Sequence, residues 1–150
     1  MTAELYPKVY LYRRIVQAKL FIDEHFNEPL DLHNIADEAF FSKFHFLRLF
    51  KSVYGRTPHQ YLTLVRIQKS KELLKNKNTT VSAVCFEVGF ESITSFTSLF
   101  KRHTAVTPAS YQKKQMRLLE ESHRKPLKFV PNCFIMANGW NVSVGEEKQF

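Results

Sequence analysis

Residues 41–51 read Phe41-Ser42-Lys43-Phe44-His45-Phe46-Leu47-Arg48-Leu49-Phe50-Lys51, and the chain repeats much of this stretch fifty positions later (92 minus 42). The second copy retains Ser92, Phe96, Leu99, Phe100 and Lys101. A Thr-Pro pair and a tyrosine follow each copy, at Thr57-Pro58 and Tyr61 and then at Thr107-Pro108 and Tyr111. Two copies of a short basic helical unit indicate a protein that contacts its partner twice.

The charge of the chain indicates what that partner is. Lysine and arginine number 22 against 14 acidic residues, which gives a net charge of +8 and an isoelectric point near 9.6. Such a balance implies an anionic partner, and the alternative is a basic protein with no such partner. At 150 residues and 44% apolar content, the chain suits one domain or two small folded lobes. Together with the repeat, the charge favours double-stranded DNA as the partner.

The cysteines and the N-terminus bound the cellular setting. Cys85 and Cys133 are too few for a disulfide framework or a zinc site, so we expect a buried reduced thiol at Cys85. The first seven residues lack the basic and apolar regions of a signal peptide, and no apolar run reaches bilayer length. We therefore expect a cytoplasmic protein with no metal and no cofactor.

Apolar spacing predicts helices along most of the chain. The expected ranges are 9–26, 31–39, 42–55, 57–75, 81–88, 92–104 and 107–121. Val81, Val84, Cys85 and Val88 match Leu32, Ile35, Ala36 and Ala39 at an offset of 49, and Gly89 matches Phe40. The offset becomes 50 from Ser92 onward, so the second copy gains one residue in its turn.

The two repeated helices each have a predicted buried face and a predicted outward face. The residues expected to be buried are Phe46, Leu49, Phe50 and Val53, and then Phe96, Leu99, Phe100 and His103. The residues expected to face outward are Phe44, Leu47, Arg48 and Lys51, and then Thr94, Thr97, Ser98 and Lys101. Gly55 is placed to end the first of these helices.

The character of the chain changes after Lys125. Residues 129–136 are apolar and strand-like, and Asn138-Gly139 is a signal for a two-residue hairpin turn before the alternating residues 140–144. A small C-terminal β-hairpin is therefore predicted, and a partly ordered tail is the alternative.

A short helix, a tight turn and a second helix with a basic outward face form the helix-turn-helix pattern. Its second helix can enter a major groove, which is about 12 Å wide. Two such helices must lie roughly 34 Å apart to read one face of the duplex, and a helix over 57–75 would span about 27 Å. We predict an all-α fold with subdomains at 9–56 and 78–121, a connecting helix at 57–77 and a C-terminal extension at 122–150.

Residues 31–114 resemble the AraC/XylS family of bacterial transcription regulators. The match rests on the repeated Ser, Phe, Leu-Phe-Lys and Thr-Pro positions and on residues between them, namely Ile35-Ala36, Gly55, Arg66, Leu73-Leu74, Val84-Cys85 and Val88-Gly89-Phe90. The resemblance implies two helix-turn-helix subdomains joined by a long helix and bound to adjacent major-groove segments. It also implies RNA polymerase as a protein partner and favours an activator, although the residues do not separate activation from repression.

The chain departs from the family at both units. Phe40 stands where the first turn usually has glycine, whereas Gly89 retains it in the second. Ser98 stands where an arginine is common, and Ile93 and Thr94 replace lysine or amide side chains.

We assign DNA-contacting roles from the outward faces. The expected base contacts are Phe44, Leu47, Arg48, Ile93, Thr94, Thr97 and Ser98. The expected phosphate contacts are Ser42, Lys43, Lys51, Ser92, Lys101 and Arg102.

The first unit carries the long side chains. Arg48 can bond guanine O6 and N7 with two donors, and its alternative is a phosphate contact or solvation. Phe44 and Leu47 suit a thymine methyl, and their alternative is packing against a neighbouring helix. The second unit offers methyls and short hydroxyls, so we expect the first unit to dominate sequence choice. His45 and Arg66 are expected to be structural, the latter in an ion pair.

Other classes of function fit less well. The sequence has no arrangement of catalytic residues, and the one enzymatic alternative is an alkyl-accepting Cys133, so we expect no enzyme. A second alternative is a sensor in which the C-terminal extension binds a ligand or a partner. Nothing precedes Val9 to form an effector domain, so we expect a standalone regulator that is a monomer or a weak dimer.

Overall fold

The computed structural model describes residues 5–31, 35 and 42–139, and every element within them is a helix. The elements are α1 (Leu5–His25), α3 (Lys43–Tyr54), α4 (Pro58–Leu73), α5 (Val81–Glu87), α6 (Ile93–Thr104), α7 (Pro108–Arg124), the 3-10 helix η1 (Pro126–Phe129) and α8 (Asn132–Ala137). The predicted all-α class is confirmed. None of these helices has the length and apolarity to cross a membrane.

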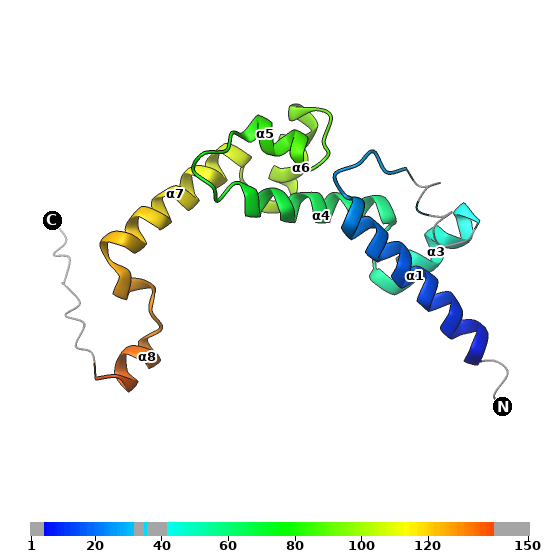
Figure 1. Cartoon of the computed structure of the whole chain (residues 1–150), viewed down its shortest axis with the longest axis horizontal. Helices are drawn as coiled ribbons and strands as arrows, with labels where there is room; N and C mark the ends of the chain where they lie inside the picture. The colour runs from blue at the N-terminus through cyan, green and yellow to red at the C-terminus, as the bar shows by residue number, and fades with distance from the viewer. Residues whose placement is uncertain (1–4, 32–34, 36–41, 140–150) are drawn as a thin grey trace.

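Helix α4 runs through the middle of the molecule and carries a lobe at each end (Figure 1). Helices α1 and α3 pack at one end, and α5 and α6 pack at the other. Helix α7 leads away from the second lobe to α8, so α8 and the start of α1 lie at opposite ends of the molecule. We call the lobe of α1 and α3 the first lobe and that of α5 and α6 the second lobe.

Each lobe has its own hydrophobic core. The first core consists of Ile15, Ala18, Ile22, Ile35, Phe46, Phe50 and Leu62. The second consists of Ile67, Leu74, Val84, Cys85, Val88, Phe90, Phe96 and Phe100. The predicted buried phenylalanines of both repeated helices are confirmed, and α4 supplies side chains to both cores.

The Thr-Pro pairs start helices as predicted. Thr57 precedes α4, where its hydroxyl accepts from the Gln60 N–H at 3.3 Å and its own N–H donates to the Gln60 side chain at 3.0 Å. Thr107 accepts from the Ser110 N–H at 3.3 Å before α7. These bonds satisfy N–H groups that have no partner inside a helix, and proline fits the first turn because it has no N–H to satisfy.

Two predictions of burial were wrong. Val53 is 37% exposed, and His103 is exposed. Both residues lie in the last turn of their helices. The helix face that covers the core in the preceding turn is exposed to solvent in this last turn. His45, which was expected to have a structural role, is also exposed. The prediction of a helix over 31–39 falls mostly outside the described residues, although Ile35 is helical and buried. Its N–H donates to the Asp31 carbonyl at 3.3 Å.

The predicted strand over 129–136 was wrong. This part of the chain forms η1 and α8, and the second strand proposed for 140–144 lies outside the described residues. The Pro131 carbonyl accepts from the N–H groups of Phe134 and Ile135, at 2.9 and 3.2 Å, and so starts α8. Asn138 and Gly139 donate to carbonyls of that same helix at 3.2 Å, so the Asn-Gly pair ends a helix here. A short apolar run fits a strand or a helix equally well.

Candidate nucleic-acid interface

Helix α3 exposes one line of side chains to solvent. Phe44 is 75% exposed, and Lys43, Arg48 and Lys51 are exposed as well. Residues 44, 48 and 51 have the i, i+4, i+7 spacing that places them on one face of a helix. Leu47 is half-buried and packs against the first core, so its edge alone is available to a partner.

Helix α6 exposes the same positions with different chemistry. Ile93 is 42% exposed, and Thr94, Ser98, Lys101 and Arg102 are exposed, whereas Thr97 is half-buried. The Ser92 hydroxyl accepts from the Ser95 N–H at 3.4 Å and so caps this helix. Ser42 occupies the equivalent position before α3, but it makes no side-chain capping bond.

The two helices are one scaffold used twice. Residues 42–60 and 92–110 have the same burial at every one of their paired positions. Phe44 therefore pairs with Thr94, Leu47 with Thr97, and Arg48 with Ser98. Each exposed face is ordered by a buried pair beneath it, Phe46 with Phe50 and Phe96 with Phe100, whose ring centroids lie 5.5 and 5.7 Å apart.

An ion pair and a hydrogen bond fix the first lobe to α4. The Tyr61 hydroxyl donates to Asp23 at 2.8 Å, and Lys19 donates to the other oxygen of that carboxylate at 2.5 Å. Burial raises the pKa of Tyr61, and the bond to Asp23 raises it further. The pKa of Lys19 is raised by its bonds to Asp23 and Tyr61. This network holds α1 against the helix that carries both lobes.

Arg66 lies between the lobes, and its partners differ from the predicted ion pair. Its Nε donates to the Phe26 carbonyl at 2.6 Å, and one terminal nitrogen donates to the Glu28 carbonyl at 2.7 Å. The guanidinium lies over the Phe90 ring, 5.6 Å from its centroid. Burial lowers the pKa of Arg66, and the negative charge of Glu91 opposes that change. Arg66 is structural as predicted, but it bonds backbone carbonyls.

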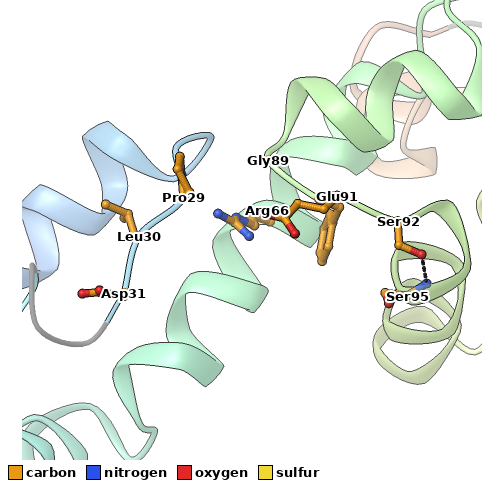
Figure 2. A pocket seen from close by; sticks show the side chains of 9 residues that line it. Pro29, Leu30, Asp31, Arg66, Gly89, Glu91, Ser92 and Ser95 are labelled. Atoms are coloured by element: carbon orange, nitrogen blue, oxygen red, sulfur yellow. Dashed lines mark hydrogen bonds between the residues drawn. The ribbon is translucent and has the colours of Figure 1, made fainter.

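A hollow of about 430 Å³ opens beside Arg66 (Figure 2). Residues 29–31 of the first lobe line one side, and residues 89–92 and Ser95 of the second lobe line the other. Asp31 and Glu91 bring negative charge to it, so it does not suit an anion.

The contact between the loop that follows α1 and the turn at Gly89 could not be predicted directly from the sequence. Gly89 has a φ of +90°, and a Cβ added to it would lie 2.8 Å from the Asn27 carbonyl oxygen. The return of glycine at this turn, where the first copy has Phe40, was the one indication of a close approach. Phe40 itself lies outside the described residues.

The described residues offer few candidates for metal binding or for catalysis. Within the described residues, no group of histidine, cysteine and acidic side chains has the arrangement of a metal site. Cys85 is buried and reduced, and burial raises the pKa of its thiol. Cys133 is exposed and reduced.

Comparisons with known proteins agree with this geometry. A family model described as a helix-turn-helix domain matches residues 35–114, which is more than half of the chain. The bifunctional transcriptional activator and DNA repair enzyme AdaA of Bacillus subtilis is 34% identical over 69% of this chain and 48% of its own length. The right origin-binding protein of Escherichia coli is 33% identical over 63% of this chain and 32% of its own. This chain thus spans half or less of these two curated relatives.

A solved structure has the same fold. The DNA-binding domain of AdpA, described as a global transcriptional factor in complex with a target DNA, superposes with a TM-score of 0.64 at 27% identity. The superposition covers 75% of this chain and 96% of that domain.

Proposed function

Because the chain belongs to the AraC/XylS family of helix-turn-helix proteins, we propose that it is a transcription regulator that binds double-stranded DNA sequence-specifically. In this proposal α3 and α6 are its recognition helices, and they enter adjacent segments of the major groove. The observation that carries the proposal is the duplicated exposed face, in which two buried phenylalanine pairs present two solvent-exposed lines of side chains.

The exposed phenylalanine of α3 is the clearest mark of a binding face. An aromatic side chain that is 75% exposed on a helix stays in water unless a partner covers it. In a major groove, Phe44 would lie against a thymine methyl, and Arg48, one turn along, would bond guanine O6 and N7. Leu47 contributes its exposed edge.

The second face has shorter side chains. Ile93, Thr94, Thr97 and Ser98 would contact base edges through methyls and through hydroxyls bridged by water. The residues proposed to hold the phosphates on both sides are Ser42, Lys43, Lys51, Ser92, Lys101 and Arg102. We propose that the first lobe selects the sequence and that the second lobe mainly adds affinity.

Helix α4 supports the separation that this mode needs. Its 16 residues span about 24 Å at 1.5 Å per residue. The recognition helices lie on lobes at either end of it, so their separation can approach the roughly 34 Å of one DNA turn. This supports the division into two DNA-binding subdomains, a connecting helix and a C-terminal extension.

The names of the relatives support a proposal for the partners and the location of this chain. AdaA is named a transcriptional activator, and we extend activation through RNA polymerase to this chain as part of the proposal. A protein that acts on a bacterial chromosome works in the cytoplasm. Two recognition helices in one chain make a monomer, or a weak dimer, sufficient for binding. We propose no enzymatic activity, although AdaA is also named a DNA repair enzyme.

Selection from random double-stranded oligonucleotides tests the proposal. An asymmetric motif that spans about two helical turns, with affinity that falls as salt rises, is the expected result. Recovery of a palindrome would contradict a monomer that carries both reading faces. Equal affinity for all sequences would contradict sequence-specific binding.

A second candidate function uses the C-terminal extension to sense a ligand or a partner. Phe129, Phe134 and Met136 are 46%, 51% and 82% exposed, which is a large apolar surface to leave in water. Deletion of residues 126–150 tests this candidate. A change in oligomeric state or in DNA affinity would support this candidate. A truncated protein with the same oligomeric state and the same DNA affinity would exclude it.

A further inference from the structure

The loop that follows α1 contacts both lobes. Phe26 is the first residue of this loop, and its ring packs against the first core and also against the second core. The loop therefore belongs to the first lobe by sequence and to both lobes by packing. Any change in the angle between the lobes would pull Phe26 away from one of the two cores.

Arg66 binds this loop from α4. Its two donors reach the carbonyls of Phe26 and Glu28, and the planar guanidinium holds them in a fixed fork that the single ammonium of lysine lacks. The Arg66 guanidinium also lies over the ring of Phe90, which is in the turn between α5 and α6. One side chain thus connects the first-lobe loop, the central helix and the second-lobe turn.

Gly89 brings the two lobes together at the backbone. The Asn27 carbonyl lies where a side chain would begin, at 2.8 Å from the ideal Cβ position. Only glycine permits both this approach and the φ of +90°. The turn of the second lobe therefore lies directly against the loop of the first (Figure 2).

A single helix would leave the lobes less fixed. Helices bend, so lobes that are joined by α4 alone could change their angle without breaking a contact between them. The contacts of Phe26, Arg66 and Gly89 form a second connection that lies off the axis of α4. We call these residues, with Asn27, Glu28 and Phe90, the interlobe joint.

We propose that the interlobe joint sets the spacing and relative orientation of α3 and α6, so that Arg66 determines which separation of two DNA half-sites the protein accepts. This inference rests on the proposed function. Arg66 acts here as a positioning residue, because it holds the lobes and contacts no base.

The first test measures spacing preference in DNA. The operator from the random selection is rebuilt with one base pair inserted or removed between the half-sites, which shifts them by about 3.4 Å and rotates them by about 35°. We expect the normal chain to lose roughly tenfold in affinity on either change, and the Arg66→Met variant to lose less than about threefold. Arg66→Lys, which retains the charge but not the two-donor plane, should lie between them. Arg117→Met on α7 is the matched control and should behave as the normal chain does.

The second test needs no DNA. Spin labels are placed on α3 and α6 through Ser52→Cys and His103→Cys, in a Cys133→Ser background, and the distribution of distances between them is measured by pulsed electron resonance. We expect a narrow distribution that widens with Arg66→Met, while the helical circular dichroism signal stays the same. Should Arg66→Met fail to fold, Arg66→Lys carries both measurements.

The outcomes separate the two proposals. Equal affinity for all DNA sequences would contradict the proposed function. The distances between the spin labels would then test, without DNA, whether the interlobe joint fixes the separation of α3 and α6. An unchanged distance distribution together with an unchanged spacing penalty in a folded Arg66 variant overturns the inference.

Discussion

The two lobes share a scaffold and differ in chemistry. Residues 42–60 and 92–110 agree in burial at every paired position, yet the exposed line changes from Phe44 and Arg48 to Thr94 and Ser98. Burial is what folding requires of these residues, whereas the exposed line is free to match a partner. The two copies therefore agree where their side chains pack and differ where their side chains are exposed.

The lobes also differ in how they are held. The first lobe is tied to α4 by the Tyr61–Asp23 bond, and its helix α3 ends at Gly55 with a φ of +68°. In the second lobe, helix α6 ends at Ala105 with a φ of +66°, a left-handed conformation that is unfavourable for alanine. The second lobe is instead pressed against the first at Gly89.

The largest expected effect is at that contact. Gly89→Ala adds a methyl 2.8 Å from the Asn27 carbonyl oxygen and adds backbone strain, so we expect a loss of about 3 kcal/mol in the free energy of unfolding. Gly55→Ala is the control, because nothing lies within 4 Å of its Cβ position and only the strain applies. Urea denaturation measures both, and equal losses would show that the lobes do not press together at this turn.

The next effect separates the two reading faces. We expect Arg48→Ala to reduce the preference for the selected operator over a scrambled site by about 1–3 kcal/mol, because a two-donor base contact is lost. Ser98→Ala, at the paired position, should reduce that preference by less than about 0.5 kcal/mol, since a short hydroxyl contributes at most a single or water-bridged contact. Lys51→Ala should weaken both sites equally and lower the salt slope by about one. Fluorescence anisotropy on both DNAs measures all three, and equal loss of preference from Arg48→Ala and Ser98→Ala would contradict the unequal roles.

A smaller effect tests how the lobes are anchored. Tyr61→Phe removes a hydrogen bond to a partly exposed carboxylate, and we expect a loss of about 1 kcal/mol in the free energy of unfolding. Tyr111→Phe, its counterpart, should cost less, because within the described residues that hydroxyl makes no side-chain hydrogen bond. Thermal denaturation of both variants gives the comparison.

Burial of the Tyr61 hydroxyl, together with its bond to Asp23, predicts a dependence of stability on pH. The fold raises the pKa of Tyr61, so its contribution is full below about pH 10 and is lost as pH rises through the folded pKa. Tyr61→Phe should therefore flatten part of the decline in stability above pH 10. An unchanged alkaline profile would show that the fold does not raise the pKa of Tyr61.

The smallest effect is expected at the C-terminal ends of α3 and α6. Ala105→Gly relieves the left-handed strain but adds freedom to the unfolded chain, so we expect a net gain of about 0.5 kcal/mol in the free energy of unfolding. Gly55→Ala introduces the same strain, so we expect it to lower the free energy of unfolding. Calorimetry at matched pH checks the pair, and a loss of stability in Ala105→Gly would contradict the strain.

Local signals predicted most of the fold. The Phe46–Phe50 and Phe96–Phe100 spacing and the two Thr-Pro pairs act within a few residues, and the structure has their helices as expected. Ile67 and Ser70 on α4 are buried but were not predicted. Ser70 satisfies its hydroxyl on the Ile67 carbonyl at 2.8 Å, which makes a polar residue acceptable inside the second core.

Contacts between segments that are distant in the chain could not be predicted from the sequence. The carbonyls of Phe26 and Glu28 have no side-chain signature, so the role of Arg66 could be predicted as structural without its partners. Residues 129–136 failed for a different reason, because their apolar run has no period that separates a strand from a short helix. Candidate DNA contacts could be named because exposure on a helix follows from spacing, and their roles remain a proposal.

Phe26 has a consequence for how this chain folds. Its half-buried ring packs against both cores, so disorder in one lobe would remove contacts that the other lobe also uses. Two halves that resemble separable modules should therefore melt in a single cooperative step. The repeat in the sequence divides the chain into two similar halves, whereas the contacts of Phe26 join those halves into one unit of unfolding.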